Sequence, residues 1–189
     1  MQLKPTKLDG AFVVESRRLC DDRGWFARVF CADTFAAHGL ETRFVQINHS
    51  CTRRRGSIRG LHFQLPPAAE VKLIRCTRGA VFDVIVDLRL GSPTLLRWLA
   101  VELRATDGRS LYVPRGFAHG FQALTDNAEV TYPTSASYAS DHEGGVRWDD
   151  PAVGIRWPIA VGDAPLSPKD LAWPLIEPGF AGIDLCASC

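Results

Sequence analysis

The sequence has almost no excess charge of either sign. Its 189 residues include 22 Lys and Arg against 21 Asp and Glu, which leaves a formal charge of +1. Without a global positive field, this composition does not favour nucleic acid or an anionic membrane as a partner. No stretch approaches the roughly 20 apolar residues of a membrane span, and Met1–Pro5 lacks the apolar region of a signal peptide. We therefore expect a cytoplasmic protein with no nucleic-acid or membrane partner.

Internal repeats and low-complexity linkers are also missing. The hydrophobic fraction of 46% supplies enough apolar residues for a core and excludes a disordered chain. A length of 189 residues fits one domain of ordinary size. We assign residues 1–176 to this domain and residues 177–189 to a C-terminal tail.

The six cysteines show no repeated spacing, apart from a C-x-x-C pair formed by Cys186 and Cys189 at the C-terminus. A disulfide framework is typical of small secreted domains, and this chain shows no export signal, so we expect reduced thiols. One C-x-x-C pair supplies only half the ligands of a zinc shell. The pair alone therefore does not predict a metal site.

Short β-rich runs alternate with Gly, Pro, Asp and Asn at intervals of about 8–12 residues, which is typical of a sandwich or barrel. Helical signals are few: one covers Asp33–His38, and the other is Ser167–Asp170, which resembles an N-cap followed by Pro at the first helical position. We predict an all-β, antiparallel double-sheet jelly roll with a few short helices. The predicted strands are Ala11–Glu15, Trp25–Cys31, Phe44–Ser50, Ser57–Gln64, Val71–Thr77, Val81–Leu88, Leu95–Glu102, Ser110–Val113, Phe117–Leu124 and Glu129–Thr134.

Strand alternation indicates which side chains share a face. Asp83 and Asp87 lie on the same face of their predicted strand, because successive side chains point to opposite faces. Carboxylates among apolar residues suit the lining of a barrel cavity better than a dry core. Simple alternation puts Arg59 and His62 on opposite faces, but a bulge at Gly60 would bring both to one side.

Two histidines stand in segments with motif-like spacing. The segment from Gly108 to His119 fits G-x5-P-x-G-x2-H and closely resembles the second motif of cupins, whose histidine projects into the barrel. The first cupin motif, G-x5-H-x-H, matches from Gly56 to His62 and then fails, because Gln64 replaces the second histidine. An uncharged amide is a poor substitute for an imidazole ligand. We therefore predict neither a metal nor another cofactor.

Two imidazoles that face a polar cavity without a metal indicate acid–base chemistry, because histidine titrates near neutral pH. The alternative is that each is a hydrogen-bonded core histidine. Polar side chains in the neighbouring strands favour a ligand, since each buried polar group without a partner costs on the order of 1 kcal/mol or more. These side chains are Gln46, Asn48, Arg59, Lys72 and Asp83.

Nine segments, in order from about residue 5 to residue 173, resemble the dTDP-4-dehydrorhamnose 3,5-epimerases, a family of metal-independent cupins. Any one segment could match by chance, but nine in order with family-like spacing make a strong signal. They are Asp22–Phe26, Phe44–Ser50, Ile58–Gln64, Asp83–Arg89, Ser92–Thr94, Val113–Phe121, Arg147–Pro151, Ile155–Pro158 and Ser167–Asp170.

The resemblance implies roles for four residues. The family's substrate is a nucleotide-linked 4-keto-6-deoxyhexose, in which C3 and C5 flank the C4 ketone and carry acidified protons. By resemblance, His62 is the base and Asp170 orients it, Tyr132 is the acid on the opposite face, and Lys72 stabilises the charge on the C4 oxygen. By itself, Lys72 could instead be a solvent-facing strand lysine, and Asp170 could be only a capping residue.

Two of these roles have rival residues. Asp83 competes with Asp170 as the partner of His62. Tyr138 competes with Tyr132 as the acid, and Tyr132 would then be a packing residue of the barrel.

Substrate binding follows from the same resemblance. Arg23 and Arg59 match ligands of the diphosphate, since guanidinium groups pair with phosphate oxygens in a bidentate manner. The three arginines at positions 53–55 are interpreted as a solvated loop and receive no site. The other positions that match substrate contacts are Phe26, Arg28, Gln46, Asn48, His119, Tyr138, Glu143 and Lys169.

The sequence departs from the family pattern at two positions. Arg28 stands where a glutamate is common, and Pro133 stands where a lysine often follows the tyrosine. These changes leave the base and the acid intact, but they leave open the identity of the sugar and whether C3, C5 or both are inverted. The segment Glu177–Cys189 has no counterpart in the pattern and is a candidate for a disordered tail.

Three classes of function remain at this stage. The first is a homodimeric epimerase of a dTDP-linked sugar, with the dimer implied by the family, which pairs barrels through strand exchange. The second is a metal-dependent cupin oxygenase that uses His62 and His119. The third is a sugar-nucleotide-binding module without turnover, which the changes at Arg28 and Pro133 make plausible.

Overall fold

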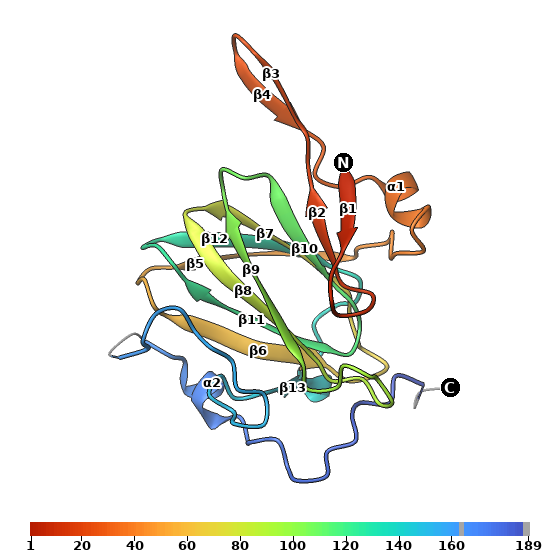
Figure 1. Cartoon of the computed structure of the whole chain (residues 1–189), viewed down its shortest axis with the longest axis vertical. Coiled ribbons are helices and arrows are strands. Elements are labelled where there is room, and N and C mark those ends of the chain that lie inside the picture. The colour runs from red at the N-terminus through yellow and green to blue at the C-terminus, as the bar shows by residue number, and fades with distance from the viewer. Residues whose placement is uncertain (163–164, 187–189) are drawn as a thin grey trace.

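The chain folds into two β-sheets that face each other around a common core (Figure 1). The computed structural model describes residues 1–162 and 165–186. One sheet has six strands in the order β1-β2-β10-β7-β12-β5, and the other has five in the order β13-β6-β11-β8-β9. Their strands pair antiparallel. The predicted double-sheet jelly roll is confirmed.

The strands of the six-stranded sheet are β1 (Gln2–Pro5), β2 (Phe12–Glu15), β10 (Arg109–Val113), β7 (Lys72–Arg78), β12 (Ala128–Thr134) and β5 (Gln46–Thr52). Those of the five-stranded sheet are β13 (Glu143–Gly145), β6 (Ile58–Gln64), β11 (Phe117–Ala123), β8 (Ala80–Asp87) and β9 (Trp98–Arg104). Each predicted strand overlaps an observed one. β1, of four residues, and β13, of three, were not predicted.

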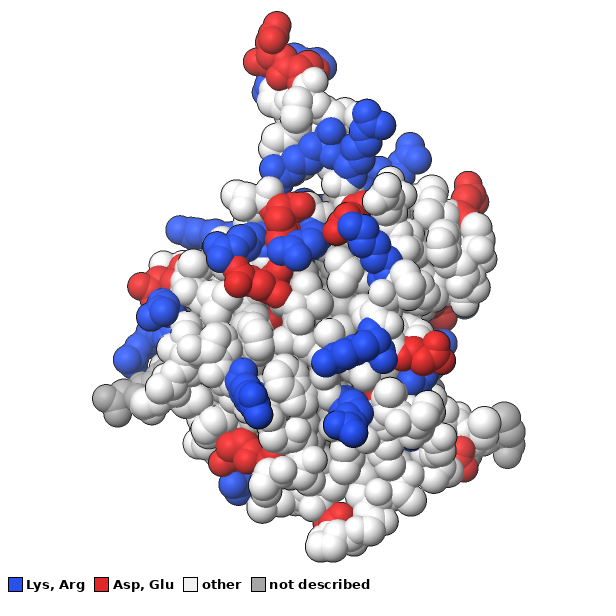
Figure 2. Space-filling model, viewed as in Figure 1, with Lys and Arg blue, Asp and Glu red and all other residues white. Residues whose placement is uncertain are grey.

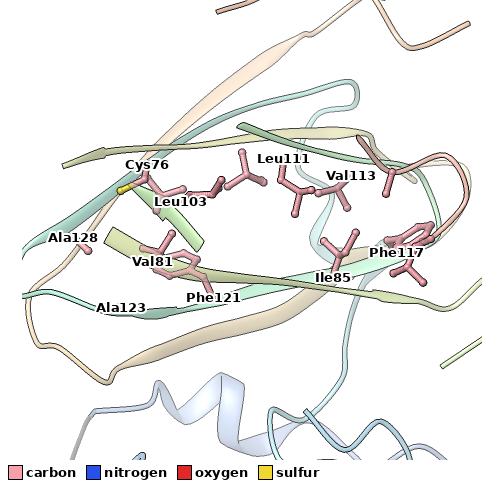
Figure 3. Packing of buried hydrophobic residues seen from close by; sticks show 14 residues of the cluster. Cys76, Val81, Ile85, Leu103, Leu111, Val113, Phe117, Phe121, Ala123 and Ala128 are labelled. Atoms are coloured by element: carbon pink, nitrogen blue, oxygen red, sulfur yellow. The ribbon is translucent and has the colours of Figure 1, made fainter. Parts of the chain in front are cut away.

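Apolar side chains from both sheets fill the space between them (Figure 3). Leu111 extends from the six-stranded sheet, and Val81, Ile85 and Phe121 extend from the five-stranded sheet; all four are buried. Val81 and Ile85 share this inner face with Asp83, as the alternation along β8 predicts. One carboxylate therefore lies at the edge of an apolar core.

The outer face of the five-stranded sheet is covered by the C-terminal part of the chain. Val84 of β8 packs in a second buried cluster with Val153 and Ile183. The N–H of Ile183 donates to the carbonyl of Leu88 at 2.6 Å. The prediction of a disordered tail is therefore wrong for residues 177–186, whose apolar side chains cover the sheet. Cys189, the second residue of the C-x-x-C pair, lies outside the described residues.

A separate hairpin of β3 (Arg18–Asp21) and β4 (Gly24–Ala27) projects from the top of the barrel in Figure 1. The predicted strand from Trp25 to Cys31 ends early, at Ala27. Trp25 is 50% exposed and Phe26 is 64% exposed. Figure 2 shows a band of mixed basic and acidic side chains below this hairpin. The hairpin thus carries exposed aromatic residues and contributes little to the barrel core.

The helices are short: α1 (Ala32–Ala36), α2 (Pro168–Ala172) and the 3-10 turn η1 (Ser140–His142). α2 begins as predicted, because Ser167 Oγ accepts a hydrogen bond from the Asp170 N–H at 3.0 Å and Pro168 occupies the first turn. α2 lies beside β6 in Figure 1. No helix in the described part of the chain is long and apolar enough to cross a membrane.

Candidate active site

A bulge in β6 brings Arg59 and His62 to the same side of the sheet. β6 pairs with β11, and the register shifts between His119 and Phe121. Gly60 lies at this shift with a φ of +103°, and a Cβ there would meet the His119 carbonyl oxygen at 2.7 Å, so glycine alone fits. The predicted bulge is confirmed, and Arg59 and His62 line one pocket.

This pocket, of about 670 Å³, opens between the two sheets and is closed on one side by residues 165–170. A smaller cavity of about 140 Å³ adjoins it, because His62, Lys72 and Tyr132 line both. The other predicted site residues divide between the two spaces. Arg59, His119, Lys169 and Asp170 line the larger one, and Gln46, Asn48, Tyr138 and Glu143 line the smaller one.

His62 is paired with Asp170. Its Nε2 lies 2.5 Å from Asp170 Oδ1, and the carboxylate is only 5% exposed. Burial raises the pKa of Asp170, but the hydrogen bond and charge of His62 and the Ser167 hydroxyl outweigh it, so this pKa lies below the ordinary 3.8. The carboxylate is therefore charged near neutral pH and holds the His62 ring in place through its hydrogen bond.

Asp83, the rival partner, is engaged with the other histidine. Its Oδ1 lies 2.8 Å from His119 Nε2. Burial raises the pKa of Asp83, against the opposing charges of His119 and Lys72. Asp83 Oδ2 is buried without a partner among the described residues. Each pocket histidine thus has its own carboxylate, and Asp83 is not the partner of His62.

Tyr132 and Tyr138 occupy different surroundings. The ring of Tyr132 lies inside the barrel, 6.4 Å from the ring of His119. Burial raises the pKa of Tyr132 above the ordinary 10.0, so its phenol keeps its proton at neutral pH. Tyr138 is 56% exposed, and its hydroxyl donates to Glu143 Oε2 at 2.7 Å. Tyr132 is therefore the phenol that lines both cavities with His62.

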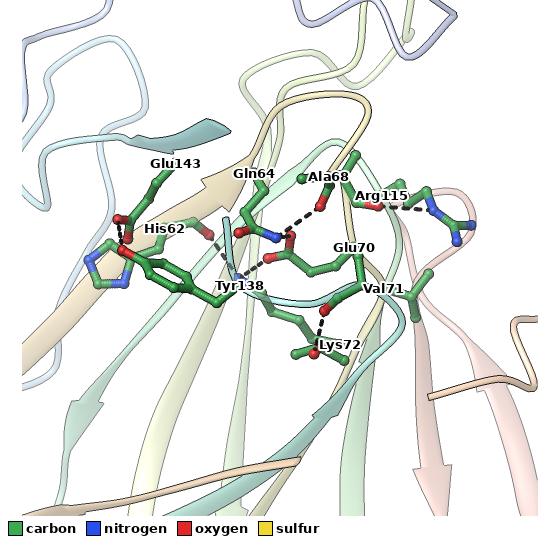
Figure 4. A network of polar contacts seen from close by, with 12 residues as sticks. His62, Gln64, Ala68, Glu70, Val71, Lys72, Arg115, Tyr138 and Glu143 are labelled. Atoms are coloured by element: carbon green, nitrogen blue, oxygen red, sulfur yellow. Dashed lines mark hydrogen bonds and ion pairs between the residues drawn. The ribbon is translucent and has the colours of Figure 1, made fainter. Parts of the chain in front are cut away.

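Lys72 is buried, which rules out the alternative of a solvent-facing lysine. Its Nζ lies 3.0 Å from Glu70 Oε1 and donates to the His62 carbonyl at 3.2 Å. Glu70 also accepts a hydrogen bond from Gln64 Nε2 at 2.6 Å, in the network of Figure 4. Gln64, which replaces the second cupin histidine, thus holds the carboxylate that pairs with Lys72.

Residues around the smaller cavity hold one another in place. Lys169 Nζ lies 2.5 Å from Glu143 Oε2, and Gln46 Nε2 donates to Asn48 Oδ1 at 3.0 Å. Burial raises the pKa of Glu143, but hydrogen bonds from Lys169 and Tyr138 lower it by more. The pKa of Glu143 therefore lies below its ordinary value. Among the described residues, no three His, Cys, Asp or Glu side chains form a group that could hold a metal ion.

Three predicted substrate ligands, Arg23, Phe26 and Arg28, line neither cavity of their own chain. Arg23 lies at the tip of the β3–β4 hairpin, where its 90% exposed guanidinium pairs with Asp21 at 2.5 Å. The hairpin projects away from α2 (Figure 1). Within a single chain, these three residues therefore do not join His62 in one pocket.

The structure adds two residues that the sequence analysis left without a site. Arg53 and Arg54 line the larger pocket together with Arg59. The signal was a run of three arginines just before a strand with a predicted phosphate ligand. A charged run by itself does not show which side chains face a cavity, so the sequence alone predicts only a solvated loop here.

Comparisons with known proteins agree with this geometry. Residues 5–177 match the family model of dTDP-4-dehydrorhamnose 3,5-epimerase. The protein of that name from Methanothermobacter thermautotrophicus is 45% identical over 174 residues, which cover 91% of this chain and 93% of that protein.

Two solved structures extend the likeness to the fold. The dTDP-4-dehydrorhamnose 3,5-epimerase of Bacillus anthracis, solved with TDP and PPi bound, has a TM-score of 0.88 and 41% identity, covering 93% of this chain and 99% of that one. ChmJ, a 3'-monoepimerase from Streptomyces bikiniensis solved with dTDP-quinovose, has a TM-score of 0.84 and 35% identity, covering 90% and 86%. This chain therefore belongs to the dTDP-4-dehydrorhamnose 3,5-epimerase family and is a sugar-nucleotide epimerase.

Proposed function

We propose that this enzyme acts on a dTDP-linked 4-keto-6-deoxyhexose and inverts carbon centres beside the C4 ketone. The observation that carries the proposal is that His62, which is paired with Asp170, and the Tyr132 phenol line the same two cavities. The TDP bound to the Bacillus anthracis relative supports the choice of nucleotide. No redox step is needed, because inversion only removes and returns a proton.

His62 is the proposed base. With Nε2 donating to Asp170, the neutral ring carries its free lone pair on Nδ1. Nδ1 accepts the proton from the carbon beside the ketone, and the electron pair of that C–H bond moves into an enolate. Asp170 then stabilises the imidazolium. A positioned base of this kind contributes roughly 10²–10⁴-fold to the rate.

Lys72 and Tyr132 act on the enolate that forms when His62 removes the proton. The Lys72 ammonium lies at the junction of the two cavities, where it stabilises the negative charge that develops on the C4 oxygen. The Tyr132 phenol returns a proton to the carbon from the face opposite His62. Its raised pKa supports this role, since the acid must be protonated when the enolate forms.

The two cavities bind different parts of the substrate in this proposal. We assign the hexose to the space of about 140 Å³, where Gln46, Asn48 and Glu143 offer hydrogen-bonding groups to sugar hydroxyls. The nucleotide takes the larger space, of about 670 Å³, beside Arg59 and His119. This orientation puts the diphosphate near the junction, next to the Arg59 guanidinium.

A homodimer is the proposed assembly. Arg23, Phe26 and Arg28 match substrate contacts in the family, yet they lie on or next to the β3–β4 hairpin and line neither cavity of their own chain. In a dimer that exchanges these strands, each hairpin reaches the pocket of the other copy.

Residues 1–176 form the proposed catalytic domain, with residues 177–189 as an appended segment.

Solvent-deuterium exchange tests the reaction. The enzyme is incubated with dTDP-4-keto-6-deoxyglucose in heavy water, and loss of the C3 and C5 proton signals is followed by NMR. We expect exchange in the native enzyme and none in His62→Ala. The carbon at which deuterium enters and the configuration inverts is the centre on which the enzyme acts. Relatives differ in the carbons that they invert, because ChmJ is a 3'-monoepimerase and the Bacillus anthracis relative is a 3,5-epimerase.

A matched control is Asp149→Asn, which breaks the exposed pair between Asp149 and Arg147 outside both cavities and should leave exchange unchanged. Tight binding of the sugar nucleotide without exchange would instead favour a binding module. Stoichiometric iron in the purified protein, with an activity that depends on it, would favour the oxygenase.

A further inference from the structure

The three arginines at positions 53–55 follow β5 and are divided by the fold into two groups. Arg55 is tied back to a neighbouring turn: its backbone N–H donates to Asp126 Oδ1 at 2.8 Å, and its Nε donates to the Leu124 carbonyl at 3.1 Å. The Arg53 carbonyl accepts from the Asn127 N–H at 3.1 Å. These contacts hold the loop in one conformation before any ligand arrives.

Arg53 and Arg54 are directed differently from Arg55. Both line the larger pocket, both are exposed, and neither pairs with a carboxylate among the described residues. Arg59 lies next to them, with its Nε donating to Thr52 Oγ1 at 2.9 Å and its Nη2 to the Cys51 carbonyl at 3.0 Å. These partners are neutral, so they orient the guanidinium without cancelling its charge.

The two lysines of the pocket are each paired with a carboxylate. Lys72 lies 3.0 Å from Glu70, and Lys169 lies 2.5 Å from Glu143. In the described part of the chain, Asp170 is the only carboxylate that lines the larger pocket, and it is engaged with a histidine. Among the described residues, the positive charge of this pocket that has no carboxylate partner is therefore carried by the guanidinium groups of Arg53, Arg54 and Arg59.

We infer that Arg53 and Arg54 bind the diphosphate of the nucleotide together with Arg59 and set its affinity. The inference rests on the proposed function, which puts a nucleoside diphosphate in this pocket. Guanidinium groups pair with phosphate oxygens through charge-assisted, often bidentate hydrogen bonds. A loop that is rigid before binding loses little conformational entropy when the anion arrives.

The test is calorimetric binding of two probes, dTDP and thymidine, to the full chain and to R53Q/R54Q. We expect the Kd for dTDP to rise by about tenfold or more, since a hydrogen bond to a charged group is commonly worth a factor of that order. Binding of thymidine should be unchanged, because it carries no phosphate. The salt dependence of dTDP binding should also become weaker in the variant.

Two further variants test whether a weaker binding of dTDP has another cause than the loss of these two guanidinium groups. R43Q removes the same kind of charge from an exposed arginine outside both cavities and should bind dTDP like the native chain. R53K/R54K keeps the charge without the planar fork and should bind with intermediate affinity. Equal melting temperatures for all variants show that the loop change has not unfolded the barrel.

The inference is overturned if R53Q/R54Q binds dTDP within about twofold of the native Kd, or if dTDP and thymidine weaken equally. Those results would leave the proposed function intact. A native chain that binds no dTDP at all would instead contradict the proposed function, and with it the inference.

Discussion

Nε2 of His62 lies 2.5 Å from Oδ1 of Asp170, although the two residues are 108 positions apart in the sequence. His62 stands on β6, and Asp170 stands in the first turn of α2, where the Ser167 hydroxyl accepts its backbone N–H. The cap at the start of α2 therefore also sets the position of the carboxylate that the proposed base needs.

Asp170→Asn should lower kcat for epimerisation by about 10²–10⁴-fold, with a smaller change in KM. The amide has nearly the same shape, but it carries no charge to stabilise the imidazolium. Steady-state kinetics with dTDP-4-keto-6-deoxyglucose measure both constants. Asp149→Asn is the matched control, because its exposed partner Arg147 lies outside the pocket. A kcat for Asp170→Asn equal to that of this control would contradict the assigned role.

Tyr132→Phe should separate proton removal from inversion. His62 still abstracts a proton, so hydrogen exchange with solvent continues, but no acid returns a proton from the other face, and the epimerised product falls by about 10²–10⁴-fold. Tyr138→Phe should have a smaller effect, because its hydroxyl donates to Glu143 at 2.7 Å rather than to a group inside the barrel. NMR of deuterium content and product stereochemistry distinguishes the two. A larger loss of inversion in Tyr138→Phe would reverse the assignment.

Gly145→Ala should weaken both stability and activity. Gly145 pairs with His62 across β13 and β6, and a Cβ there would lie 2.1 Å from Trp173 Cε2. Trp173 caps the C-terminal end of α2, so the clash pushes away the helix that carries Asp170. We expect a loss of about 1–3 kcal/mol in the free energy of unfolding, as for other overpacked sites.

Thermal and urea unfolding measure this change. Trp173→Leu in the Gly145→Ala background should restore part of the stability, because the smaller side chain relieves the clash. Additive losses in the double variant would show that the two positions are not coupled.

The stability contributed by Asp170 should depend on pH. Its pKa in the folded state lies below the ordinary 3.8, so the folded protein holds the ionised form more tightly than the unfolded chain does. The contribution is therefore fully present above 3.8 and is lost as the pH falls through the folded-state pKa.

Urea unfolding of the native chain and Asp170→Asn between about pH 6 and pH 3 tests this. The difference in the free energy of unfolding between the two should shrink toward the acid end of the series. A difference that stays constant or grows as the pH falls would contradict this prediction.

Much of the site was predictable from local pattern. The glycine at position 60 predicted the bulge that joins Arg59 to His62, because a bulge needs a residue that tolerates positive φ. The motif that begins at Ser167 predicted the helix start, since a hydroxyl acceptor and a following proline are both local signals. Such features depend on neighbours in the chain, which the sequence displays directly.

Other parts depended on contacts between distant residues. Alternation put Asp83 on the cavity side of β8, but only strand register decides that it meets His119 rather than His62. The hairpin with Arg23 carries family-like residues, yet its direction away from the pocket appears only in three dimensions.

The amino-acid sequence by itself determined that this protein is a double-sheet β-protein of the epimerase family, because alternation, turns and motifs are local properties. The tertiary structure alone decided which carboxylate holds each histidine and that the arginines at 53 and 54, unlike Arg55, face the pocket. The physical reason is that hydrogen bonds and ion pairs act over a few ångströms. Their partners are therefore chosen by packing, which no local pattern encodes.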